Sequence, residues 1–155
     1  MLVNVQVHVS KGQVWIEIPQ AKLKVNIPDI VACETSTRQI VALGQTADEI
    51  KAEAPDQWER HSNQIEFRPA FDTNRFEPEL TVTVLRYYAS KAQARIRPGL
   101  IVRFLGLYID QFHYDLEIPG YGNLLTKTQN KLVRLLRTLP CMRRCTVNGK
   151  RVLGR

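Results

Sequence analysis

The segment between residues 27 and 91 holds the strongest local signals in the chain, and their order restricts what the chain can fold into. The apolar stretch Ile40–Leu43 runs into Gly44, which suits a tight turn from a strand into a helix and should resist replacement. A second short strand, Ile65–Arg68, precedes Pro78, and proline is favoured in the first turn of a helix. This alternation of strands and helices predicts an α/β domain in which helices flank a mixed sheet.

Each of the two expected helices has its own start signal. Thr46 and Glu49 have the spacing of a capping box, which predicts a helix that begins at Thr46 and ends near residue 54. The helix that starts at Pro78 has one buried face, made of Thr81, Val84, Leu85 and Tyr88. We expect Leu85 to be buried in this helix, and Val41 to be buried in the strand before the glycine turn.

Further strands are expected on both flanks of this segment. They cover residues 1–9, 13–19, 22–27, 30–33, 100–109 and 111–118, and the last two are expected to pair with each other. The first two form a hairpin about Gly12, and the next two continue its sheet. Near the C-terminus, Asn123 is a candidate cap for a helix, and residues 141–153 suit either a terminal strand or a hairpin about Asn148-Gly149.

The central segment is similar to the first subdomain of bacterial actins of the MreB, rod-shape-determining type. Three motifs carry the resemblance: residues 28–32 for the family's Pro-x-Val-Val-Ala strand, residues 42–47 for its Ala-Val-Gly-x-x-Ala turn, and Arg68-Pro69 for its Arg-Pro segment. From residue 68 to residue 88 the alignment has no gap, with Asp72, Glu77 and Leu85 at the family's Asp, Asp and core Leu positions.

This resemblance implies a single actin/ribonuclease-H-like subdomain over residues 1–155, with a basic C-terminal helix and strand at residues 123–155. It also implies a protein of the cytoplasm, in some cases peripheral to the membrane, because actin-like subdomains polymerise or dock onto membrane-linked partners. The alternating residues 1–9 have strand periodicity and lack the build of a signal peptide, which agrees with a cytoplasmic protein.

Positive charge is concentrated at the C-terminal end. Residues 1–126 carry all 15 acidic residues and 13 of the 22 basic ones, a net charge of −2, whereas residues 127–155 carry nine basic residues and no acid. In the expected helix of this segment, the leucines share one face: Leu125, Leu132, Leu135, Leu136 and Leu139.

Basic side chains in this segment are the candidate partner-binding residues: Lys127, Lys131, Arg134, Arg137, Arg143, Arg144, Lys150 and Arg151. Without neighbouring acids they suit an acidic protein surface, an anionic membrane surface or the phosphates of a nucleic acid. The alternative interpretation is that the lysines and arginines only solvate a helix whose leucines cover the sheet.

Catalytic signals are incomplete. The MreB resemblance implies a nucleotide site at the first hairpin, where the family carries Asp-Leu-Gly-Thr, but residues 8–12 offer one glycine and no carboxylate. A two-metal nuclease needs an acid on the first strand, which has none, and Glu17, Asp110 and Asp115 do not form the expected set. We therefore expect no ATP hydrolysis, no cofactor and no enzymatic activity.

Cysteine and histidine spacing does not favour a metal site. Cys141 and Cys145 supply at most two ligands, and the three histidines are scattered along the chain. We expect Cys33 to be a small buried residue and the other two to be free thiols, with pKa values lowered by neighbouring arginines where exposed.

Taken together, the residues and the resemblance predict a non-catalytic actin-like interaction or assembly module without a nucleotide site. Its basic C-terminal segment would bind a protein or membrane-associated partner, and the chain could also form oligomers. The alternative is a basic nucleic-acid-binding protein.

Overall fold

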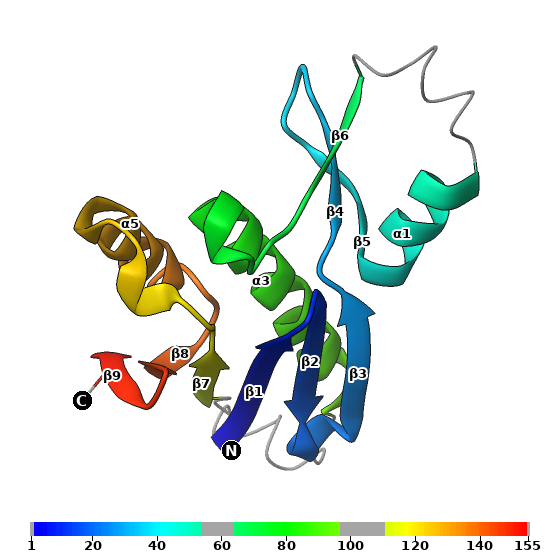
Figure 1. The fold of residues 1–155 in the computed structure, drawn as a ribbon. Coiled ribbons are helices and arrows are strands. Elements are labelled where there is room, and N and C mark those ends of the chain that lie inside the picture. Colours follow the sequence, from blue (N-terminus) through cyan, green and yellow to red (C-terminus); the bar gives the residue numbers. More distant parts are fainter. Residues whose placement is uncertain (1, 54–63, 97–110, 155) are drawn as a thin grey trace.

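The computed structural model describes residues 2–53, 64–96 and 111–154, which form a mixed α/β fold with two sheets (Figure 1). The larger sheet has six strands in the order β3-β2-β1-β7-β8-β9, and the smaller has three in the order β5-β4-β6. This architecture confirms the predicted mixed sheet with flanking helices. The predicted strand at residues 100–109 lies outside the described residues.

The first three strands of the larger sheet form an antiparallel meander: β1 (Leu2–Ser10), β2 (Gln13–Ile18) and β3 (Leu23–Pro28). The β1–β2 turn confirms the predicted hairpin. Lys11 and Gly12 both have positive φ values, +50° and +72°, as a two-residue turn matched to the twist of the strands requires.

In the other half of the larger sheet, β7 and β8 run parallel to β1, and β9 runs antiparallel to them. Strand β7 (Gln111–Glu117) pairs in parallel with β1 on one side and with β8 (Met142–Val147) on the other, and β9 (Lys150–Leu153) closes the edge as the second strand of a hairpin. Both edges of β7 are thus occupied by β1 and β8, whereas residues 100–109, the predicted partner of residues 111–118, lie outside the described residues. The hairpin predicted over residues 141–153 is confirmed.

The smaller sheet contains β4 (Val31–Glu34), β5 (Ile40–Leu43) and β6 (Ile65–Arg68), accompanied by helix α1 (Gly44–Glu53). The expectation that residues 30–33 continue the sheet of the first hairpin is therefore wrong. After Pro28 the chain is redirected by Asp29, whose backbone N–H donates to the Gly12 carbonyl and whose carboxylate accepts from the N–H groups of Ala70 and Phe71.

Both α3 (Pro78–Arg95) and α5 (Thr126–Leu136) pack on one face of the larger sheet and touch each other. Their buried residues meet the inward-pointing side chains of β1, β2, β7 and β8. The predicted face of α3 is confirmed, because Thr81, Val84, Leu85 and Tyr88 are all buried. No described helix is long and apolar enough to cross a membrane.

Some predicted details are wrong at element ends. Helix α1 begins at Gly44, so Thr46 lies inside it, and Glu49 accepts a hydrogen bond from the Gln45 side chain. Asn123 does not cap α5, because the N-cap is Leu125, which makes no capping hydrogen bond. Leu125 itself is 77% exposed, since it precedes the helix and lies off the buried leucine face.

Val41 was expected to be buried but is 52% exposed. It lies on β5, the edge strand of the smaller sheet, where successive side chains alternate between faces. The neighbouring Ala42 takes the inward position and is buried against α1.

Replacing Gly44 should destabilise the fold. Its φ of +55° is a left-handed conformation, and an added Cβ would stand 3.0 Å from the Ile27 Cβ. We expect Gly44→Ala to cost about 1–2 kcal/mol in urea unfolding. Gly122→Ala is the matched control, because nothing lies within 4 Å of an added Cβ there. Equal stabilities of the two variants would contradict this account of Gly44.

Candidate functional site

The eight basic residues proposed from the sequence lie on three elements. Lys127, Lys131 and Arg134 are on α5 and Arg137 is its C-cap; Arg143 and Arg144 are on β8; Lys150 and Arg151 are on β9. Because α5 covers one face of the larger sheet, the helix residues and the strand residues form separate surfaces. We call them the helix surface and the strand surface.

The helix surface contains Lys127, Arg134 and Arg137, which are exposed, and Lys131, which is half-buried. Lys131 forms an ion pair with Glu79 in the first turn of α3. Burial raises the pKa of Glu79, but the hydrogen bond and charge of Lys131 outweigh burial, so this pKa lies below its ordinary value. Lys131 therefore links α5 to α3, and the other three side chains remain available for contacts.

The strand surface lies on the opposite face of the larger sheet, which α3 and α5 do not cover; among the described residues we call it the open face. Arg144 pairs across the sheet with His113 of β7, and Arg151 pairs with Thr146, so both arginines share the polar face. A bulge in β8 inserts Arg143 between Met142 and Arg144, and the Arg143 guanidinium donates to the Gln111 side-chain oxygen. Lys150 follows the β8–β9 turn and is exposed.

A separate pocket of about 280 Å³ surrounds the first hairpin turn. Ser10, Lys11 and Gly12 line one side of it, and Asp29 and Asp72 line the other. Asp29 and Asp72 come close to the hairpin because of the way the chain passes between the two sheets, and this could not be predicted from the sequence. Gly12 connects the hairpin to this region, because its carbonyl accepts a hydrogen bond from the Asp29 N–H.

Both carboxylates of this pocket already have structural partners. Asp29 holds the backbone N–H groups of Ala70 and Phe71, at 2.8 and 3.2 Å. Burial raises the pKa of Asp29, while those hydrogen bonds oppose the rise. Asp72 caps a short 3₁₀ helix, Thr73–Arg75, by accepting from the Asn74 N–H at 2.9 Å.

The acids considered for a nuclease do not converge. Glu17 and Asp115 are cross-strand partners of the same residue, Gln6, on opposite sides of β1. Two strand spacings of about 4.8 Å therefore separate their backbones. Asp110 lies outside the described residues. Within the described ranges, no three His, Cys, Asp or Glu side chains are grouped closely enough to hold a metal ion.

The cysteines differ in their surroundings. Cys33 is buried, as expected, and burial raises the pKa of its thiol. Cys141 is exposed, whereas Cys145 is fully buried under the helices. Burial raises the pKa of Cys145 to about 12, and the lowering by arginines that was predicted for an exposed thiol does not apply to this buried one.

Comparisons with known proteins find similarity at the level of structure. No protein-family model matches the sequence, and no curated protein matches it. The crystal structure of MreB5 of Spiroplasma citri bound to ADP superposes with a TM-score of 0.57 and 12% identity, over 96% of this chain and 38% of that one. The AMPPNP-bound structure of the same protein gives a TM-score of 0.58 and 11% identity, over 95% of this chain and 38% of that one.

The chain spans 38% of the length of these MreB structures. At this level of identity the structural similarity concerns the fold alone. This similarity agrees with the MreB-like motifs at residues 28–32, 42–47 and 68–69. The chain therefore has the fold of a partial actin-like subdomain of the MreB type.

Proposed function

We propose that this chain is a non-catalytic actin-like interaction module, whose basic C-terminal segment binds an acidic protein or an anionic membrane surface in the cytoplasm. One observation carries the proposal: of the eight candidate side chains, Lys131 alone forms an ion pair within the described ranges. Unpaired surface cations attract acidic partners over about a Debye length, roughly 8–10 Å at physiological salt.

The composition of the first hairpin supports a function without catalysis. The turn residues supply no carboxylate, and Asp29 and Asp72, the acids nearest to it, hold backbone N–H groups. These hydrogen bonds give both carboxylates a structural role at the junction beside the hairpin.

A nucleotide binder is the second candidate, favoured by one observation. The hairpin pocket brings Lys11 and Gly12 to a cavity of about 280 Å³ in a fold whose similar structures are bound to ADP and AMPPNP. Thermal unfolding with and without ATP and magnesium separates the two functions. A ligand present at 100 times its Kd stabilises a protein by about 2.7 kcal/mol.

Charge reversal tests the proposed binding function on each surface. Lys127, Arg134 and Arg137 are changed together to Glu on the helix surface, and Arg143, Arg144 and Arg151 on the strand surface. Lys131 is kept because it pairs with Glu79. We expect both triple variants to fold, since solvated surface charges contribute at most about 1 kcal/mol each.

Binding is measured by fluorescence anisotropy with a labelled glutamate-rich peptide, and by co-sedimentation with anionic vesicles. We expect one triple variant to lose at least tenfold in affinity, equivalent to about 1.4 kcal/mol, and the other to lose much less. If both variants bind like the parent, the basic segment is only a solubilising surface. Tighter binding to a labelled RNA, falling steeply with salt, would favour the nucleic-acid alternative.

A further inference from the structure

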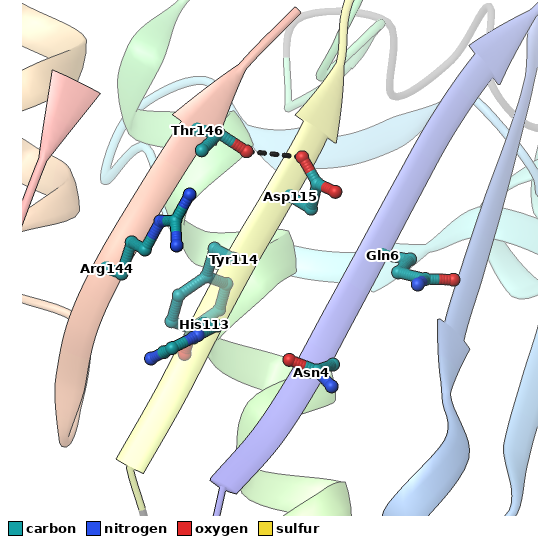
Figure 2. A pocket seen from close by; sticks show the side chains of 7 residues that line it. All are labelled: Asn4, Gln6, His113, Tyr114, Asp115, Arg144 and Thr146. Atoms are coloured by element: carbon teal, nitrogen blue, oxygen red, sulfur yellow. Dashed lines mark hydrogen bonds between the residues drawn. The ribbon is translucent and has the colours of Figure 1, made fainter. Parts of the chain in front are cut away.

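The open face of the six-stranded sheet carries a row of hydrogen-bond donors. Asn4 of β1, His113 of β7 and Arg144 of β8 are cross-strand partners in one line across three parallel strands. Figure 2 shows these side chains on the face turned away from the helices. Neighbouring strands are about 4.8 Å apart, so one small ligand can span two members of the row.

Within the described part of the chain, these donors are not used in protein contacts. Among the described residues, the side chains of Asn4, Gln6, His113 and Arg144 form no hydrogen bond or ion pair. They line a depression of about 200 Å³, the volume of six or seven water molecules at about 30 Å³ each. The fifth polar group, Asp115, accepts a hydrogen bond from Thr146 at the next row of the sheet.

The charges that face His113 come from two strands. Arg144 and Arg143 approach it from β8, while Asp115 stands two positions away on its own strand, about 6.6–6.8 Å along the backbone. The facing residue from β1 is the neutral Asn4. Partial burial and then the two arginines lower the pKa of His113. The positive charges of Arg143 and Arg144 make this end of the depression attractive to an anion.

We propose that Asn4, His113 and Arg144 form a binding site for one oxyanion group, the chemistry shared by a carboxylate and a phosphate. Arg144 donates two parallel N–H groups to two oxygens, and His113 and Asn4 donate from the side. The site shares Arg144 with the strand surface, but it concerns a small anion and is tested with small anions, so the result does not depend on whether that surface binds a protein or a membrane.

Binding at this site is pH-dependent. Neutral imidazole donates through one nitrogen, whereas the protonated ring donates through both and adds a positive charge. A bound anion favours the protonated ring, so binding takes up a proton. Affinity therefore rises as the pH falls through the pKa of His113, which lies below its ordinary value of 6.5 in the free protein.

The test is an NMR titration of the full chain that follows the His113 ring signals, with inorganic phosphate in one arm and acetate in the other. Ionic strength is held constant with sodium chloride. We expect saturable shifts in at least one arm. Acetate, which stays mostly ionised over this range, should bind severalfold more tightly at pH 5.5 than at pH 8. Phosphate changes its own charge between these pH values, so it is compared with acetate at each pH separately. The arm that saturates at lower concentration identifies the preferred oxyanion.

Three variants decide whether the row is the site. Arg144→Met should lower affinity at least tenfold, and Asp115→Asn should raise it by removing a competing carboxylate. Arg95→Met, at an exposed arginine in the last turn of α3 that belongs to neither basic surface, is the matched control and should titrate like the parent. Shifts that never saturate in both arms, or an Arg144→Met variant that binds like the parent, would overturn the proposal.

Discussion

Leu132→Asp should unfold the domain, whereas the same substitution at Leu125 should leave it folded and slightly more stable. Leu132 is fully buried where α5 packs on the sheet. An unpaired carboxylate there costs at least several kcal/mol, a large part of the 5–15 kcal/mol that stabilises a typical domain. Circular dichroism of the variant should show no cooperative thermal transition above room temperature.

The opposite sign at Leu125 follows from its position. Leu125 is 77% exposed and is the N-cap of α5, where its side chain cannot accept a hydrogen bond. An aspartate at the N-cap accepts from the first-turn N–H groups and interacts favourably with the helix dipole, which together contribute about 1 kcal/mol. A Leu132→Asp variant that melts cooperatively within a few degrees of the parent would contradict the placement of α5.

Elements with local causes could be predicted from the sequence. The two hairpins turn at Lys11-Gly12 and Asn148-Gly149, whose positive φ values are a property of the turn residues themselves. Pro78 starts α3 and the 3.6-residue period identifies its buried face, because both signals lie within a few residues. The strand Ile40–Leu43 and the strand Ile65–Arg68 were also placed correctly.

Details that depend on distant contacts could not be predicted. β4 lies in the smaller sheet, and Asp29 holds the N–H groups of residues about 40 positions away. β7 is a central strand because β1 and β8 both pair with it, and nothing in residues 111–117 specifies those partners. The alternation of β5 determines that Ala42 points inward and Val41 outward, but periodicity alone does not say which face is covered.

The candidate site was also predictable only in part. The excess of basic residues was visible in the sequence, but the fold places some of them on α5 and the others on β8 and β9, on opposite sides of the larger sheet. The bulge at Arg143 decides that Arg144 faces His113, and a bulge of one residue shifts every later side chain to the other face. Asn4 and His113 join the site only through the register of β1 and β7.

Leu85→Ala should destabilise the domain by about 2–5 kcal/mol, the cost of removing a fully buried leucine and leaving a cavity. Leu85 lies on the face of α3 that packs on the sheet, with Thr81 and Tyr88 as buried neighbours on the same helix face. Urea unfolding followed by circular dichroism measures this loss.

The matched control for Leu85 is Val41→Ala, which removes a side chain that is 52% exposed on an edge strand. Its cost should stay below about 1 kcal/mol, within the range of strand propensity differences. Both residues were predicted from the sequence to be buried, whereas the structure buries Leu85 alone, so the two variants separate the prediction from the structure. A loss at Val41 that matches the loss at Leu85 would mean that β5 is covered in solution, and a loss at Leu85 below about 0.5 kcal/mol would mean that α3 is misplaced on the sheet.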